Sequence, residues 1–321
     1  MLLPRFIAGM FSAGLMVLGA GVASGQDYPN KPIRIVTTPP GGGSDIVARI
    51  VAQGISGPLG QQVVVDNRAS GIVAGDFVSK SPPDGYILLV WANAFVVGPL
   101  LLQKVPYDPV RDFSPVILAA QTPNILVVHP SLPVKSVQEL IALAKARPGE
   151  LNYSAGSTGG TTHLAAELFK SMAGVDMVNI PYKSTAMETA DLIGGYVQLT
   201  FATGASVAPL IKAGRLRAVA VTSAQPSTLF PGLPTVAASG LPGFESVTFL
   251  GLWAAARTPA PIINRLNQET ARFVNTQEAK ERFTSSGLEA VGSTPEQFAA
   301  TIKSEVAKMG KVIKDAGIKV Q

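Results

Sequence analysis

Short apolar runs alternate along the chain with segments in which apolar residues recur every three or four positions. The runs are rich in Val, Ile and Leu, which is typical of strands that are covered on both faces in a largely parallel sheet. They predict strands at Ile33–Thr37, Val63–Asp66, Tyr86–Trp91, Ile125–His129, Leu151–Ser154, Met177–Pro181, Val197–Phe201, Leu216–Thr222 and Val247–Ala254. Strands that alternate with amphipathic helices in this way predict an α/β fold.

Two of the predicted helices have clear start signals. Ser136–Glu139 reads as a capping box, and Arg147–Gly149 ends the helix that it opens. Thr294–Gln297 reads as a second capping box. The helix that follows carries one apolar stripe, which predicts that it packs on the core through Phe298, Ile302, Val306, Met309 and Ile313.

Two glycine-rich turns, Pro39–Asp45 and Asn152–His163, each lead from a predicted strand into a predicted helix. The first turn of a helix has unpaired backbone N–H groups at the positive end of the helix dipole, so both turns are candidate anion sites. The same turn chemistry also joins strands to helices that bind nothing. The residues alone leave both interpretations open. Because the turns lie in separate blocks, a site that used both would sit between two domains.

Residues 1–25 are expected to be a signal peptide, with one charge at Arg5, an apolar stretch over Phe6–Val22 and small residues at Ala23–Gly25. An uncleaved membrane anchor is the alternative. Export places the protein in the periplasm, and the absence of Cys excludes disulfides and thiolate metal sites. The net charge is +5, or +4 once Arg5 is removed (5 − 1), which does not indicate nucleic-acid binding.

No catalytic residue, metal ligand or cofactor site is predicted. The sequence has no G-x-S-x-G, no P-loop and no G-x-G-x-x-G fingerprint. His129 follows an apolar strand and is interpreted as structural. His163 and Glu167 are four residues apart, but a zinc helix needs a second His. A triad of Ser157, His163 and an Asp would lack the nucleophile elbow and the oxyanion loop.

Many stretches, in the same order along essentially the whole mature chain, resemble the Bug family of periplasmic solute-binding receptors, the capture subunits of tripartite tricarboxylate transporters. They are Tyr28–Arg34, Pro39–Asp45, Leu59–Arg68, Pro82–Tyr86, Val105–Phe113, Leu151–Gly156, Ile180–Lys183, Asp191–Gly195, Leu216–Ser223, Leu233–Val236 and Val291–Phe298.

The resemblance implies a type II periplasmic-binding-protein fold, with two α/β lobes, a ligand cleft and hinge strands near Asn124–Val128 and Val247–Gly251. The first lobe would combine residues 27–123 with 246–321, and the second would span 124–245. It also implies that a small carboxylate (di-, tri- or aromatic) is held between the two glycine turns. Asp45 would orient the first turn, and His163 would pack or donate at the rim of the second. The implied binding residues are Pro40, Gly41, Gly42, Gly43, Ser44, Asp45, Ser70, Asn93, Ser154, Ser157, Thr158, Gly159, Thr161, Thr162, His163, Phe201 and Ala202.

Departures from the family pattern bear on the ligand. Many members have Phe-Asp-Asn where this chain has Phe201–Thr203, so an acidic group is expected to be missing near the pocket. Trp91, Asn93 and Phe95 are expected at the pocket edge. These features favour a carboxylic acid without an amine, with an aromatic acid included.

The implied partners are the membrane permease subunits of a tripartite transporter, and the receptor itself is expected to be a monomer. A ligand sensor that signals to a histidine kinase remains an alternative. A secreted α/β enzyme that acts on a carboxylate is the second alternative.

Overall fold

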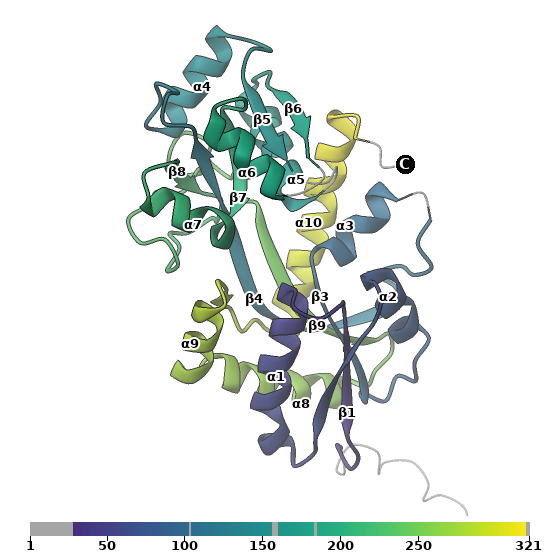
Figure 1. The fold of residues 1–321 in the computed structure, drawn as a ribbon. Helices are drawn as coiled ribbons and strands as arrows, with labels where there is room; N and C mark the ends of the chain where they lie inside the picture. The colour runs from purple at the N-terminus through teal and green to yellow at the C-terminus, as the bar shows by residue number, and fades with distance from the viewer. Residues whose placement is uncertain (1–27, 103, 156–159, 183–184, 319–321) are drawn as a thin grey trace, which may run out of the picture.

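The computed structural model describes residues 28–102, 104–155, 160–182 and 185–318. The predicted signal peptide lies outside these residues. Two groups of helices and strands lie one above the other in Figure 1, and the strands β4 and β9 run between them. The strands are β1 (Ile33–Thr37), β2 (Val63–Asn67), β3 (Ile87–Ala92), β4 (Phe113–Val128), β5 (Asn152–Ala155), β6 (Val178–Pro181), β7 (Leu199–Thr203), β8 (Arg217–Val221), β9 (Val247–Ala255) and β10 (Glu289–Ala290). The helices are α1 (Gly43–Leu59), α2 (Gly71–Ser79), α3 (Ala94–Leu101), α4 (Val137–Ala146), α5 (Thr161–Ala173), α6 (Thr185–Gly194), α7 (Gly204–Lys212), α8 (Ala260–Val274), α9 (Gln277–Ser285) and α10 (Pro295–Asp315).

The strands form one mixed sheet in the order β2-β1-β3-β9-β4-β7-β5-β6. The pairs β1–β2 and β1–β3 in the lower group, and β5–β6 and β5–β7 in the upper group, are parallel. The long central strands β9 and β4 pair antiparallel with their neighbours. The parallel prediction therefore holds for the outer strands, whereas the strands that connect the two groups run antiparallel.

The strand β4 is much longer than its apolar run predicts. It begins at Phe113, pairs first with β9 and β10, and then continues to pair with β7 and β8. Pro115 and Pro123 lie in the half that the pattern did not predict. Proline lacks an N–H and is tolerated at irregular positions, and the pairing with β9 shifts register just after Pro115.

Both predicted capping boxes open helices. The Ser136 hydroxyl accepts a hydrogen bond from the Glu139 N–H (3.2 Å) at the start of α4. At the start of α10, Thr294 and Gln297 make the two reciprocal bonds of a complete capping box. Two further helices start at a side-chain cap, α2 at Ser70 and α9 at Thr276. By contrast, the N-cap residues of α1 and α5 are Gly42 and Gly160, which have no side chain to cap the helix.

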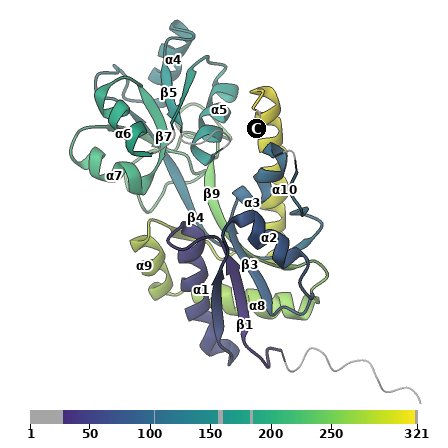
Figure 2. The ribbon, with the colours of Figure 1, turned by 45° about the vertical axis from the view of Figure 1, so that its right-hand side comes forward.

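The largest apolar cluster connects the two groups of elements. It runs from Leu89 and Phe95 through Phe298 and Met309 of α10 to Phe169 and its neighbours in the upper group. The helix α10 contacts α3 and β4 and also reaches α5, as the two views in Figure 1 and Figure 2 agree. A second cluster lies between α1, α8 and the lower strands, and a smaller third cluster lies between β4, α6 and α7. The division into lobes at residues 123/124 and 245/246 remains a prediction.

None of the helices in the described part of the chain is both long enough and apolar enough to cross a membrane.

Candidate functional site

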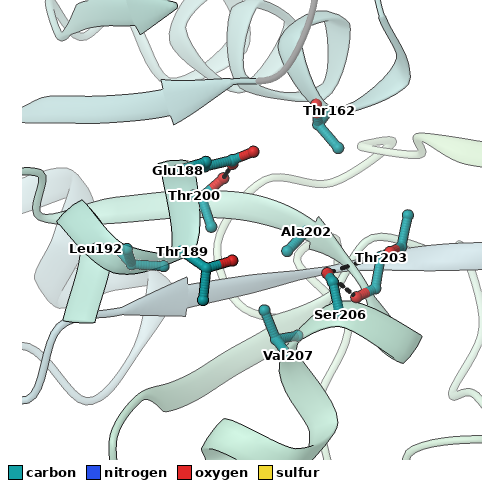
Figure 3. Close-up of a pocket in the computed structure, with 9 residues that line it drawn as sticks. All are labelled: Thr162, Glu188, Thr189, Leu192, Thr200, Ala202, Thr203, Ser206 and Val207. Carbon is teal, nitrogen blue, oxygen red and sulfur yellow. Dashed lines mark hydrogen bonds between the residues drawn. The ribbon is translucent and has the colours of Figure 1, made fainter. Parts of the chain in front are cut away.

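A polar pocket of about 110 Å³ lies in the upper group, where α5, α6 and α7 meet the end of β7. Figure 3 shows its lining, which combines five hydroxyl groups from α5, α6, β7 and α7 with one carboxylate and three apolar side chains. The lining residues are Thr162, Glu188, Thr189, Leu192, Thr200, Ala202, Thr203, Ser206 and Val207. A cavity needs roughly 10–15 Å³ of such space per water molecule, so this pocket has room for a small polar solute.

Glu188 places a carboxylate in this pocket from α6, and the side chain is buried. The hydroxyls of Ser154 and Thr200 both lie within hydrogen-bond distance of its Oε1, at 3.1 Å and 3.0 Å. The expectation that the pocket lacks an acidic group is therefore wrong. Ala202 stands in β7 at the position where the family pattern has Asp, but Glu188 supplies a carboxylate from the neighbouring helix α6.

A detectable signal for Glu188 existed in the sequence. Glu188 and Leu192 are four residues apart, so they lie on the same face of α6, and Leu192 is almost fully buried. A charged residue on the buried face of a helix is uncommon unless it has partners. The glycine turns carry a stronger sequence signal for an anion site than a single glutamate does.

The opposite part of the lining is a small hydroxyl network at the start of α7. Thr203 Oγ1 donates to Ser206 Oγ (3.2 Å), and Ser206 Oγ in turn donates to the Thr203 carbonyl (2.8 Å). Figure 3 shows both contacts at the end of β7. Neither residue was among the predicted binding residues, because hydroxyl residues at strand ends are common and carry no specific spacing.

The second predicted turn contributes to the pocket through Thr162, which lies in the first turn of α5. Thr161 precedes it and is partly buried but does not line the pocket. Three predicted residues of this turn, Ser157, Thr158 and Gly159, lie outside the described residues. The pocket therefore adjoins a helix N-terminus that has no capping side chain, as the anion argument requires.

His163 is buried beneath the pocket rather than in its lining. Its ring stacks near Tyr153 (centroids 6.4 Å apart), and its Nε2 lies 3.0 Å from Asn179 Nδ2. Burial lowers the pKa of the imidazole below its usual 6.5, although the nearby Glu167 opposes this shift. A neutral imidazole with Nε2 as acceptor agrees with the Asn179 contact. Within the described ranges, no group of three or more His, Cys, Asp or Glu side chains is placed to hold a metal ion.

The lowered pKa of His163 predicts a pH dependence of stability. The unfolded chain binds a proton near pH 6.5 and the folded chain does so only at lower pH, so the contribution is complete above pH 6.5 and falls away below it. One such group changes the free energy of unfolding by at most about 1.4 kcal/mol per pH unit. The free energy of unfolding, measured with urea at several pH values between 7.5 and 5.5, should fall less steeply with decreasing pH in His163→Gln than in the parent protein.

His129→Gln removes the other histidine of the chain and serves as the control for that measurement. Identical slopes in the parent and in His163→Gln would contradict the assignment.

The first predicted turn belongs to the lower group and does not line the pocket. The Gly41 N–H donates to Asp45 Oδ2 (3.0 Å), while Asn67 Nδ2 donates to Asp45 Oδ1 (2.8 Å) and Arg49 Nε donates to Oδ2 (3.1 Å). Burial acts to raise the pKa of the Asp45 carboxyl, but the three hydrogen bonds outweigh it and hold this pKa below its usual value. Contrary to expectation, the Gly41 N–H is therefore not free for a ligand. Pro40, Gly42 and Gly43 are exposed, whereas Ser44 is buried.

Two other predicted residues of the lower group are occupied by structural contacts. Ser70 caps α2 by accepting from the Val73 N–H at 3.3 Å. Asn93 is buried, and its Nδ2 donates to the Val247 carbonyl (3.2 Å) and to Glu305 Oε1 (3.3 Å). Neither side chain lines the pocket.

Two predicted residues of the upper group also differ from expectation. Phe201 is fully buried against Phe169 and Phe244, because successive residues of β7 point to opposite faces and its neighbours Thr200 and Ala202 face the pocket. Ser154 is also fully buried, with its hydroxyl on Glu188 rather than on the pocket surface.

The expected aromatic edge of the pocket is part of the core instead. Phe95 is fully buried and contacts Trp91, Tyr107, Phe113 and Trp253. These rings pack α3 onto the lower group, so they offer no aromatic contact to the pocket found here.

Two groups of elements that share one mixed sheet through the long strands β4 and β9, with a small pocket beside a helix start, are an arrangement found in solute-binding proteins. Solved structures of that class have the same fold. One is R. palustris Rpa4515 with adipate, which is 37% identical, covers 91% of this chain and 99% of its own, and has a TM-score of 0.72. Another is a TctC solute-binding protein from Polaromonas without ligand, which is 27% identical, covers 90% of this chain and 99% of its own, and has a TM-score of 0.81. The predicted fold class is confirmed.

The chain belongs to the tripartite tricarboxylate transporter family of receptors (TctC), whose family model matches residues 47–318. Protein BugT of Bordetella pertussis is 35% identical over 316 residues, which cover 96% of this chain and 97% of BugT. The resemblance to the Bug receptors is thereby confirmed, and a family of receptors rather than of enzymes is indicated.

Proposed function

We propose that this protein is a periplasmic receptor that captures a small carboxylate and delivers it to the permease of a tripartite transporter. The observation that carries the proposal is the polar pocket at the N-terminus of α5, within a fold whose family consists of transporter receptors. The pocket adjoins the start of α5, whose N-cap residue Gly160 has no capping side chain, and several hydroxyls line it; backbone N–H groups and hydroxyls suit a carboxylate.

The second anion-binding turn would reach the ligand when the two groups of elements close. Gly42, Gly43 and Ser44 at the start of α1 would then donate to the same carboxylate or to a second one. The comparison of shapes supports an open form here. The chain is more similar to the Polaromonas protein without ligand (TM-score 0.81) than to the adipate-bound R. palustris protein (0.72), although its identity to the latter is higher.

The binding energy is adequate for a receptor. Each hydrogen bond to a charged group contributes about 1.5–3 kcal/mol. A micromolar dissociation constant needs about −8 kcal/mol, so four or five such bonds suffice after the costs of closure and ordering. No catalytic group is required, because closure needs only a ligand that binds the closed form better than the open one.

The proposal is tested by calorimetry and by small-angle X-ray scattering on the purified protein. We expect at least one acid from a panel of mono-, di- and aromatic carboxylates to bind with a Kd of about 10 µM or tighter, and to reduce the radius of gyration. The amide of that acid is the matched control and should not bind measurably. Binding of a sugar or a neutral amide, with no response to any acid, would contradict the proposal.

Membership of the receptor family supports both the exported location and the transport role. The expected signal peptide over residues 1–25 would send the protein to the periplasm, where its solved relatives work. A receptor that signals to a sensor kinase would use the same pocket, and the monomeric state remains an expectation.

A further inference from the structure

Glu188 is the single carboxylate among the described residues that line the pocket. The residue is 8% exposed and lines the pocket. Within the part of the chain that the structure describes, no Lys, Arg or His forms an ion pair with it. A buried carboxylate without a cation or a full set of donors carries a large desolvation penalty.

The described hydroxyl partners of Glu188 contact only one of its two oxygens. Both lie at Oε1, and the Thr200 hydroxyl also lies 2.8 Å from the Ser154 carbonyl. A hydroxyl has one proton, so Thr200 cannot donate to Glu188 and to that carbonyl at the same time. Figure 3 shows one carboxylate oxygen at Thr200 and the other directed away from it. Among the described residues, both hydroxyl donors therefore lie at Oε1, and Oε2 is left for a ligand in the pocket.

We infer that Glu188 selects a ligand that carries a protonated amine, so that the ligand of this receptor is an amino carboxylic acid. The inference rests on the proposed function and specifies its substrate class. The ammonium group would donate to Glu188 Oε2, and the carboxylate would take the hydroxyls and backbone N–H groups at the start of α5. Thr162 lines the same pocket as Glu188, so both ends of a small zwitterion find complementary groups within about 110 Å³.

The two ends of the pocket have opposite chemistry, which fixes the orientation of such a ligand. Glu188 can only accept hydrogen bonds when it is ionised, whereas the backbone N–H groups at the start of α5 can only donate. An acid without an amine would leave the Glu188 charge unpaired and would add a second negative charge to the pocket. This arrangement reverses the expectation, drawn from Ala202, that an amine is poorly served.

The test compares matched acids that differ only by the amine, namely L-aspartate with succinate, L-glutamate with glutarate, and L-2-aminoadipate with adipate. Calorimetry on the parent protein should show that the amino acid of at least one pair binds at least 10-fold more tightly than its partner. Glu188→Gln keeps the acceptor for Ser154 but loses the charge. It should weaken binding of the amino acid by on the order of 10- to 100-fold, and it should leave binding of the amine-free acid unchanged or tighter, because a like charge is removed from the pocket.

Glu278→Gln on the exposed face of α9 makes the same charge change far from the pocket and should leave both affinities unchanged. If amine-free acids bind as tightly as their amino partners and Glu188→Gln leaves the ratio unaltered, the inference is overturned while the proposed function stands. If no acid of either kind binds, the proposed function is contradicted and the inference falls with it. The parent protein alone decides between these outcomes should the variant fail to fold.

Discussion

Replacing Gly42 by Asp is expected to lower the affinity for the carboxylate ligand by at least 100-fold while leaving the protein as stable as its parent. Gly42 is the N-cap residue of α1, and an added Cβ would meet no atom within 4 Å. Its φ of −83° is accessible to any residue. A new carboxylate at this position would occupy the free N–H groups and repel the ligand. At a separation of about 4 Å and an effective dielectric constant of 20, that repulsion is about 4 kcal/mol.

Stability should not fall, because Asp is among the preferred N-cap residues and Gly42 provides no side-chain cap. Gly42→Asn is the matched control, since it has the same shape without the charge, and it should retain most of the affinity. Calorimetry measures the binding and urea unfolding measures the stability. Unchanged affinity in Gly42→Asp would mean that the turn at the start of α1 takes no part in the site.

Replacing Gly251 by Ala is expected to cost about 1–3 kcal/mol of unfolding free energy, because the strand β9 has no room for a methyl group there. An added Cβ would lie 2.1 Å from Phe298 Cζ and 3.0 Å from Trp253 Cη2. Both rings are fully buried, and they contact one another at 4.9 Å between centroids. The Phe298 ring is the contact through which the start of α10 packs on the central strand.

A double-mutant cycle with Phe298→Leu tests whether crowding is the cause. The smaller side chain leaves space for the methyl group, so the two substitutions together should cost less than the sum of their separate effects. Gly310→Ala in α10 is the control, because no atom lies within 4 Å of its added Cβ and Ala favours a helix by up to about 1 kcal/mol. Additive effects in the cycle, or a Gly251→Ala protein as stable as the parent, would contradict the packing argument.

The local pattern of the sequence was enough to predict most elements of the fold. The run Ile33–Thr37 is a strand with the predicted bounds, and the Ser136 and Thr294 caps start helices where expected. These features depend on neighbouring residues, so periodicity and capping chemistry identify them. The first half of β4 escaped because Pro115 and Pro123 interrupt its pattern, and only its pairing with β9 makes it a strand.

The candidate site was predicted less completely than the fold. Of the predicted binding residues, Thr162 and Ala202 line the pocket, whereas Phe201 and Ser154 lie beneath it. Glycine turns can be recognised in a sequence, but which hydroxyl or carboxylate faces a cavity depends on how separate elements pack. Glu188 reaches the pocket because α6 packs beside β7. A local sequence pattern does not predict which helix packs beside which strand.

The sequence by itself determined the family, the alternation of strands and helices, and the two helix starts that have glycine in place of a capping side chain. These properties follow from residue order over short stretches, where backbone propensities and hydrogen bonding act. Tertiary structure alone decided the antiparallel centre of the sheet, the aromatic packing of Phe95 and the acidic lining of the pocket. Each of these depends on contacts between residues far apart in the chain, which form only when the whole core is buried.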